Sequence, residues 1–308
     1  MKIVVFGGSG FIGKQLTSYF IKKGSEVVLV SRFEREAHSD KGKQQQENSQ
    51  VRHITWHELQ KNVALLEQAD AFVNLAGETI NQRWTDKVKK KIITSRVSTT
   101  EKEAEIVQRL SYKPKVVING SAVGIYGMSE TGTFDETSSK IGDDFLAEVV
   151  KRWEKAAELM EPYTRVIKLR LGVVLGRNGG ALPKMLLPYK LFVGGKVGTG
   201  KQWLSWIHIE DLIQLIAFCI TNEAIQGPIN ATAPHPVTND EFGRALSKEL
   251  NRPHFFPVPA FLLKLMFGEM SQMLLSGQKV IPKRILDAGF QFAYPTVEKA
   301  VENFKKKL

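Results

Sequence analysis

The sequence predicts an α/β protein in which a doubly wound parallel sheet is followed by a smaller, mostly helical C-terminal lobe. Three observations predict this fold. Short apolar runs alternate with helical patterns through the first half of the 308 residues, a glycine-rich turn directly follows the first run, and the last part is apolar, Met- and Phe-rich and punctuated by Pro. Such alternation is typical of parallel sheets that helices cover on both faces.

Six runs have the length and β-branched composition of buried parallel strands. They are Ile3–Phe6, Val27–Val30, Val51–Ile54, Ala71–Leu75, Val116–Asn119 and Val166–Leu171. Apolar residues at helical spacing fall between them, near Gly10–Lys23, Thr85–Leu110 and Asp144–Met160. This order of elements predicts successive βαβ units.

The pattern changes after the sixth strand, which indicates a change of domain. We expect a sheet domain over residues 1–175, to which residues 206–231 return, and a C-terminal lobe made of residues 176–205 and 232–308. Within the lobe, Thr238 and Glu241 have the spacing of a capping box at the start of a helix.

The composition is that of an ordinary globular protein, with 43% hydrophobic and 24% charged residues. The single cysteine, Cys219, excludes an internal disulfide and fits a reducing compartment. The N-terminus shows no signal-peptide pattern, and no apolar run approaches the roughly 20 residues that span a bilayer. We therefore expect a cytoplasmic protein with no membrane partner.

The net charge of +11 raises nucleic acid as a possible partner. However, the lysines are dispersed or lie on helix faces and ends, and no basic ladder flanked by aromatic residues is present. We expect no specific nucleic-acid partner, and assign part of the charge to an anionic cofactor and a small-molecule substrate. The histidines lack the spacing of metal ligands, so we expect no metal.

The turn "GGSGFIG" after the first strand has the composition of a diphosphate site. Its glycines permit a tight strand–turn–helix connection, and the unpaired N–H groups of a helix N-terminus attract a diphosphate. We expect the cofactor to contact Gly7, Ser9, Gly10, Phe11, Ile12 and Gly13. The spacing G-x-x-G-x-x-G is a variant of the usual dinucleotide fingerprint, and a plain structural turn is the alternative.

The end of the second strand indicates which dinucleotide binds. A site that prefers NAD usually ends this strand in Asp or Glu, to hold the ribose 2′-hydroxyl. Here the strand ends in Ser31 and Arg32, with Arg35 close behind. A hydroxyl and guanidinium groups suit a 2′-phosphate, so we expect NADP, the alternative being a basic solvent loop.

Several motifs resemble those of the extended short-chain dehydrogenase/reductases, the sugar-nucleotide epimerase group. They are "GGSGFIG", "VNLAGE", "NGSAVGIYG", "LRLGVVLG" and "WIHIEDLI", in the order and at the spacings of that group. "NLAGETINQRWT", "GKQWLSWIHIEDL" and "LLSGQKVIPKRILDAGF" are similar to one atypical branch of NAD-dependent epimerase/dehydratase-like chains, the "epimerase family proteins", which carry a DUF1731-type C-terminal region. The similarity runs from Met1 to about Phe292.

The resemblance implies a Rossmann-type NADP-binding domain with a C-terminal substrate lobe, and implies that Leu75, Ala76 and Gly77 of "VNLAGE" contact the cofactor. In the extended reductases a Ser or Thr polarises the substrate oxygen, while Tyr-x-x-x-Lys on the following helix transfers a proton. Ser121 matches the serine. The dyad has no match.

The stretch "DFLAEVVKRWE" stands where the dyad should fall. Phe145 or Leu146 occupies the tyrosine place, and Val149 or Val150 the lysine place. An aromatic ring without a hydroxyl cannot relay a proton, so the usual mechanism is in doubt for this chain.

Two other residues are candidates for proton transfer. Tyr126, in "GIYG", either faces the nicotinamide end or packs at the sheet edge. Glu78 follows the fourth strand at its C-terminal end, where open α/β sheets bind ligands, and is otherwise a helix-capping or solvent residue.

Five residues are candidates for substrate binding. Arg83 and Trp84 either clamp a planar or acidic substrate or form a structural pair at a helix start. Arg96 either binds a carboxylate or phosphate or pairs with an acid. Gln202 and Trp203 lie where the second lobe rejoins the first, and either wall a ligand pocket or pack the lobes together.

Two functions remain open. The first is an NADP-dependent oxidoreductase or epimerase of atypical mechanism that acts on a small polar substrate, with Ser121, Tyr126 and Glu78 as its catalytic candidates. The second is a non-enzymatic NADP(H)-binding sensor or regulatory protein, which the missing dyad favours. A homodimer through the two long helices is left open.

Overall fold

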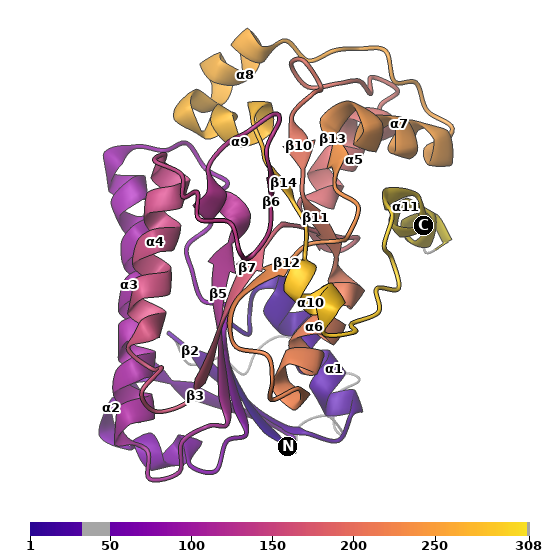
Figure 1. The fold of residues 1–308 in the computed structure, drawn as a ribbon. Coiled ribbons are helices and arrows are strands. Elements are labelled where there is room, and N and C mark those ends of the chain that lie inside the picture. The colour runs from indigo at the N-terminus through magenta and orange to yellow at the C-terminus, as the bar shows by residue number, and fades with distance from the viewer. Residues whose placement is uncertain (33–49, 307–308) are drawn as a thin grey trace, which may run out of the picture.

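The computed structural model describes residues 1–32 and 50–306, and its centre is a seven-stranded sheet in which every neighbouring pair is parallel (Figure 1). The strand order is β12-β7-β5-β4-β1-β2-β3. The chain therefore runs outward from β1 to β3, and then returns to continue from β4 on the other side. The carboxyl ends of β1 and β4 flank this reversal, the point where open α/β sheets bind their ligands.

The strands of the sheet confirm the predicted fold class and refine its bounds. They are β1 (Lys2–Phe6), β2 (Glu26–Ser31), β3 (Val51–Thr55), β4 (Ala71–Asn74), β5 (Val116–Ala122), β7 (Arg165–Leu171) and β12 (Gly227–Ala231). β4 ends one residue before the predicted Leu75, and β5 continues past Asn119 to Ala122. The sequence analysis did not identify β12, which opens with Gly227 and Pro228 and pairs with β7 alone at the sheet edge, where proline is tolerated.

Helices cover both faces of the sheet because successive strand residues point to opposite sides. Ile3 and Val5 pack in one buried cluster with α1 (Phe11–Lys22) and α6 (Ile209–Thr221). Val4 and Phe6 pack in a second cluster, against α3 (Asp86–Arg109) and α4 (Phe145–Glu158) (Figure 1).

A separate core holds the C-terminal part together. α5 (Leu182–Lys190), α7 (Asn239–Leu250) and α11 (Val297–Lys306) supply most of its buried residues. Thr238 begins α7 with the predicted capping box: its hydroxyl accepts a hydrogen bond from the Glu241 backbone N–H, and the Glu241 carboxylate accepts one from the Thr238 backbone.

Short elements complete the described chain. They are α2 (Trp56–Lys61), α8 (Ala260–Phe267), α9 (Gln272–Leu275), α10 (Lys283–Asp287), β6 (Thr133–Phe134), β8 (Val173–Gly176), β9 (Gly179–Gly180), β10 (Trp203–Leu204), β11 (Trp206–His208), β13 (Val237–Thr238), β14 (Lys279–Val280) and the 3₁₀ turns η1 (Val63–Leu66), η2 (Val123–Tyr126) and η3 (Gly268–Ser271). Across residues 1–32 and 50–306, no helix is long and apolar enough to cross a membrane.

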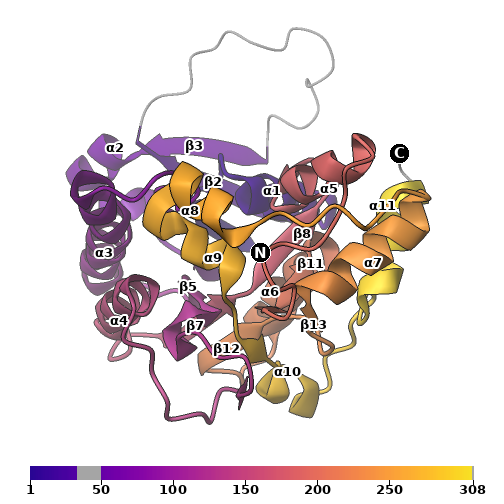
Figure 2. The same cartoon turned by 90° about the horizontal axis from the view of Figure 1, so that it is seen from above.

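The two parts of the chain are joined by contacts above the sheet (Figure 2). β14 pairs in parallel with β6, which lies between β5 and α4 in the sequence. Met270 packs with Trp84, Ile92 and Val149, so the segment after α8 is fixed to α3 and α4. The C-terminal part is therefore anchored to the sheet domain on the side of α3 and α4.

Candidate cofactor and substrate site

The glycine turn lies directly against the backbone that follows β4. Gly7 has a φ of +80°, and a Cβ there would lie 2.8 Å from the backbone N of Ala76 and 2.8 Å from the carbonyl carbon of Leu75. Only glycine fits this position without strain. The structure thus brings together two segments predicted to contact the cofactor, the glycine turn and residues 75–77.

The N-terminus of α1 is open to an anion. Gly10 caps it without a side-chain hydrogen bond, and its first turn contains no acidic residue. Gly13 lies so close to the turn that a Cβ would meet the Gly7 carbonyl oxygen at 2.5 Å. The first N–H groups of a helix have no intrahelical acceptor, so those of Phe11, Ile12 and Gly13 suit a diphosphate. Ser9 is exposed beside them.

The Phe11 ring holds a later segment against α1. A Cβ at Gly176 or Gly179 would lie 2.3 Å or 2.4 Å from ring atoms of Phe11, and one at Gly180 would lie 3.0 Å away. Three glycines of the β8–β9 hairpin therefore make room for one side chain. The Phe11 backbone thus belongs to the predicted diphosphate site, while its ring packs against the β8–β9 hairpin.

Ser31 and Arg32 lie at the carboxyl end of β2, next to β1 in the sheet. Ser31 is the last residue of the strand and pairs with Thr55 of β3, while Arg32 is exposed just beyond it. This position is the one that a ribose 2′-substituent occupies in dinucleotide folds. Arg35 lies outside the described residues.

Arg96 lies against the predicted cofactor segment. A Cβ at Gly77 would be 3.1 Å from the Arg96 guanidinium carbon, and that carbon lies 5.2 Å from the ring centroid of Trp153. On the next strand, a Cβ at Gly120 would lie 2.9 Å from the Trp153 indole. Two glycines therefore accommodate an arginine–tryptophan stack at the carboxyl ends of β4 and β5.

The Arg96 guanidinium keeps unused donors. Its Nη1 donates to the Ile92 carbonyl oxygen at 3.1 Å, its only hydrogen bond to the described residues. Burial lowers the pKa of Arg96 to about 10, although the nearby Glu78 carboxylate acts in the opposite direction. The group therefore stays charged at neutral pH, with several N–H groups free for an anionic ligand.

Glu78 is held beside Arg96 rather than being free. Its carboxylate lies 3.2 Å from the Lys91 ammonium, and its backbone N–H donates to the Ser95 hydroxyl at 2.9 Å. Arg83 is exposed, whereas Trp84 is buried, donates its indole N–H to the Ile80 carbonyl and packs edge-on to Phe145. This geometry favours the structural interpretation for Trp84.

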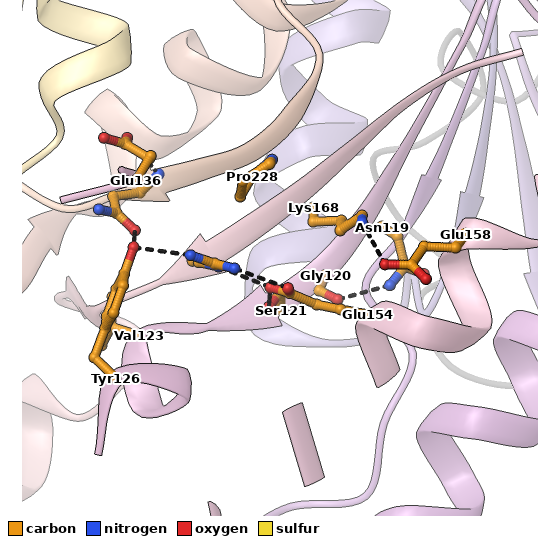
Figure 3. A network of polar contacts seen from close by, with 12 residues as sticks. Asn119, Gly120, Ser121, Val123, Tyr126, Glu136, Glu154, Glu158, Lys168 and Pro228 are labelled. Atoms are coloured by element: carbon orange, nitrogen blue, oxygen red, sulfur yellow. Dashed lines mark hydrogen bonds and ion pairs between the residues drawn. The ribbon is translucent and has the colours of Figure 1, made fainter. Parts of the chain in front are cut away.

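Ser121 and Tyr126 belong to one buried chain of polar contacts (Figure 3). The Ser121 hydroxyl donates to Glu154 at 2.6 Å, and both Glu154 carboxylate oxygens accept from the Arg170 guanidinium, at 2.8 and 2.9 Å. Arg170 also donates to the Tyr126 hydroxyl at 2.9 Å, and that hydroxyl donates to the Asn230 side chain at 2.8 Å. The network joins β5, α4, β7, η2 and β12.

These contacts occupy both hydroxyls that were candidates for catalysis. Ser121 and Tyr126 are each 1% exposed. Burial raises the pKa of the Tyr126 phenol, and the Arg170 charge only partly opposes that shift. Burial alone would lower the pKa of Arg170, but the hydrogen bonds and charge of Glu154 raise it above its usual value. The pair remains charged, and its geometry is that of a structural bridge.

The α4 positions where a Tyr–Lys dyad would stand are filled by apolar packing. Phe145 and Leu146 pack with Trp84 and Met270, and Val149 lies buried in the same cluster. Val150 is buried in another cluster, with Tyr126. The C-terminal segment therefore occupies the space next to this helix face.

The residues where the two parts rejoin have structural partners. The Gln202 amide N–H group donates to the carbonyls of Val197 and Leu274, at 3.0 and 2.8 Å. The Trp203 indole donates to the Glu130 carbonyl at 2.7 Å, and Lys279 lies over its ring. His208 accepts from the Glu210 backbone N–H at the start of α6. The Trp203 contact joins the two parts, the Gln202 contacts lie within the C-terminal part, and the His208 contact caps α6.

A second buried polar cluster lies beneath the site and was missed by the sequence analysis. The Asn74 amide donates to Glu103 at 2.7 Å and to Asn119 at 3.2 Å, and Trp153 donates to Thr100 at 3.1 Å. Burial raises the pKa of Glu103 to about 8, against the opposing hydrogen bond from Asn74. The sequence did offer one signal for this cluster: Glu103 is an acid among the apolar residues of α3, on the helix face that is buried.

Comparison with known proteins agrees with this architecture. Residues 3–231 match the family model described as NAD dependent epimerase/dehydratase family, and residues 258–304 match a domain of unknown function, DUF1731. The chain belongs to the NAD dependent epimerase/dehydratase family. This confirms the resemblance seen in the sequence motifs, including the DUF1731-type C-terminal region.

Relatives cover almost the whole chain. It is 41% identical over 305 residues to the epimerase family protein YfhF of Bacillus subtilis (strain 168), which spans 98% of this chain and 97% of YfhF. The structure of human epimerase family protein SDR39U1 (isoform 2) with NADPH is 38% identical, with a TM-score of 0.89 and full coverage of both chains. A nucleoside-diphosphate sugar epimerase from Corynebacterium glutamicum is 31% identical, with a TM-score of 0.75, over 98% of this chain and 57% of that one.

Proposed function

We propose that this epimerase-family chain binds NADP(H) across the glycine turn and uses it to reduce or epimerise a small anionic substrate held by Arg96. The observation that carries the proposal is the contact of Gly7 with the Leu75–Ala76 backbone, beside the uncapped N-terminus of α1. A Cβ at Gly7 or Gly13 would fill this cradle, so the residues present fit a dinucleotide diphosphate.

Two observations support NADP over NAD. The first is that β2 ends in Ser31 and then Arg32, with no carboxylate to hold a free ribose 2′-hydroxyl. Arginine forms strong charge-assisted hydrogen bonds to a phosphate. The second is that the structure of the human relative was determined with NADPH. Ser31 and Arg32 would hold the 2′-phosphate, and Arg35 is a further candidate.

Arg96 supports an anionic substrate because its guanidinium lies against the predicted cofactor segment and, among the described residues, makes a single hydrogen bond, to the Ile92 carbonyl. It contacts Gly77 and is oriented by stacking on Trp153. Its free N–H groups would bind a substrate carboxylate, phosphate or polarised carbonyl oxygen. When bound, NADPH would supply a hydride for reduction, whereas NADP⁺ would take up and return a hydride for epimerisation. Glu78, held by Lys91 beside this guanidinium, is the candidate for exchanging the proton.

The second candidate function is an NADP(H) sensor without turnover. It is favoured by the buried Ser121–Glu154–Arg170–Tyr126 network, which engages the hydroxyls that a reductase would use, and by the apolar face of α4. The network is consistent with a structural role for Ser121 and Tyr126. The enzyme interpretation therefore depends on Arg96 and Glu78 rather than on those two hydroxyls.

One set of measurements separates these functions. NADPH binding is measured first by fluorescence titration, and turnover is then followed by cofactor absorbance and product analysis with aldehydes, 2-oxo acids and nucleotide sugars. Arg96→Gln should raise KM for an anionic substrate by roughly 10- to 100-fold, the loss expected for a charged hydrogen bond, and leave NADPH affinity unchanged. Lys90→Gln, which removes an exposed charge from the same helix, is the matched control.

The outcomes distinguish the hypotheses. Tight NADPH binding with no turnover of any substrate favours the sensor. If Ser121→Ala abolished turnover but kept the stability and the NADPH affinity of the parent, Ser121 rather than Arg96 and Glu78 would be the catalytic residue. A protein that takes up no NADPH even at millimolar supply would refute both candidate functions.

A further inference from the structure

An exposed apolar surface runs along the C-terminal part. We define it as the exposed side chains of residues 191–193 and 255–266. Phe255 is 69% exposed, Phe261 67%, Leu265 75% and Met266 64%. Large apolar side chains so exposed, and gathered in two short segments, mark a surface that binds something.

The two segments are joined into one surface. The backbone N–H groups of Phe255 and Phe256 both donate to the Gly194 carbonyl, at 3.0 and 3.1 Å. The Arg252 guanidinium lies 4.2 Å from the Phe192 ring centroid. α8 begins at Ala260, directly after this contact, and lies at the top edge of the molecule in Figure 1.

α8 itself is packed by one side only. Leu263 is its buried residue, whereas Phe261, Leu262, Leu265 and Met266 are exposed. At 100° per residue these four cover one continuous arc of the helix, and Lys264 borders it. An amphipathic helix normally turns its apolar stripe to the core. In α8 the arc of four apolar side chains instead faces away from the core.

The charge of the surroundings has one sign. Residues 181–209 contain Lys184, Lys190, Lys196 and Lys201 and no acid, and residues 251–268 contain Arg252 and Lys264 and no acid. Asp240 on α7 and Glu269 directly after α8 are each engaged in ion pairs. Asp240 bonds to His254 and Arg244, and Glu269 forms an ion pair with Lys89. The segments that carry the exposed apolar side chains are therefore basic, with Arg252 stacked on Phe192 and Lys264 on α8 itself.

We propose that this surface docks on the face of an anionic lipid bilayer. Exposed Phe, Leu and Met enter the boundary between headgroups and acyl chains, while lysines attract the anionic headgroups. The bilayer fits better than a second copy of the chain, because a two-fold contact would bring this surface against itself, cation against cation. The expectation of no membrane partner rested on the absence of a spanning run, which surface docking does not need.

The test is co-sedimentation of the full chain with vesicles. The protein should bind vesicles that contain phosphatidylglycerol and not vesicles of phosphatidylcholine alone. Raising the salt from about 0.1 M to about 1 M, which shortens the Debye length from roughly 10 Å to roughly 3 Å, should release it. The variant Lys196→Glu/Lys264→Glu should lower affinity by at least about 25-fold, since each lysine near an anionic surface contributes about fivefold.

Apolar and control variants make the result specific. Phe261→Ser/Leu265→Ser should also lose vesicle binding, while Tyr112→Ser and Lys90→Glu, which change exposed residues elsewhere, should keep it. Thermal unfolding checks that all four fold as the parent does. Equal binding to neutral vesicles, no binding at all, or an equal loss in the controls would overturn the proposal. A dimer in light scattering that Phe261→Ser/Leu265→Ser dissociates would assign the surface to a second copy instead.

Discussion

The two ends of the candidate site are built in different ways. At the diphosphate end, backbone does the work: the glycine turn, the N-terminus of α1 and the Leu75–Ala76 segment meet at distances that only glycine permits. At the predicted nicotinamide end, the expected Tyr–Lys dyad is missing and the candidate hydroxyls are bonded to other side chains. Ser121 and Tyr126 are tied into a network around Glu154 and Arg170.

This difference indicates that the predicted dinucleotide cradle and the predicted reaction centre place separate demands on the chain. The cradle follows from chain geometry, so it persists wherever the strand–turn–helix persists. The reaction centre needs particular groups at particular positions, and α4 carries apolar residues there because Met270 and Trp84 pack against it. Four substitutions probe the comparison, in order of decreasing expected effect.

The largest effect should come from the network at the nicotinamide end. Glu154→Ala leaves the buried Arg170 charge without its partner, which should lower the free energy of unfolding by about 3–5 kcal/mol. Glu158→Ala, which removes a half-exposed partner of Lys168, is the control and should cost less than about 1 kcal/mol. Denaturant unfolding measures both, and equal effects would show that the network does not stabilise the fold.

Gly7→Ala tests the diphosphate end. The new Cβ would collide with the Leu75–Ala76 backbone at a positive φ, so we expect a loss of about 2–4 kcal/mol of stability and a large loss of NADPH affinity. Gly24→Ala is the matched control, because Gly24 has a φ of +74° and nothing within 4 Å of its Cβ position. If both variants bound NADPH like the parent, the turn would not be the cofactor cradle.

Glu103→Gln tests the cluster beneath the site. The folded-state pKa of Glu103 is about 8, above the ordinary glutamate value, so the acid stabilises the fold at low pH and loses that contribution as the pH rises toward 8. Relative to the parent, Glu103→Gln should gain about 3–4 kcal/mol of stability between about pH 5 and about pH 8. Stability curves with the same pH dependence in both proteins would contradict this assignment.

Arg32→Ala should have the smallest effect and act on cofactor choice alone. Loss of a charged contact to the 2′-phosphate should cost about 2 kcal/mol, roughly a thirtyfold weaker Kd for NADPH. NADH, which has no such phosphate, should bind as before. Titration of both cofactors checks this, and equal losses for NADPH and NADH would refute the choice of NADP.

The sequence predicted the fold well because strands and the glycine turn are set by local patterns. Ile3–Phe6 and the turn after it need no knowledge of the rest of the chain. The partners of Ser121 could not be predicted in this way. Arg170 lies beside Ser121 because of the register of β5 with β7. Glu154 lies 33 residues after Ser121 and reaches it because α4 packs over these strands.

The same limit explains the other surprises. β12 begins with Gly227 and Pro228, which read locally as a turn, and becomes a strand because β7 offers it an open edge. The sequence offered Arg96 as one of five candidates for substrate binding, and only its contacts with Gly77 and Trp153 in the structure show where its guanidinium lies. Contacts between distant segments, rather than local pattern, decide these features.

The Phe11 ring within Gly176, Gly179 and Gly180 has a mechanical consequence. The ring fills the space that three side chains would need, so α1 cannot slide or rotate without displacing the β8–β9 hairpin. α5 begins two residues after that hairpin and supplies core to the C-terminal part. A movement of α1 on binding a nucleotide would therefore move the β8–β9 hairpin, and through it α5 and the C-terminal part.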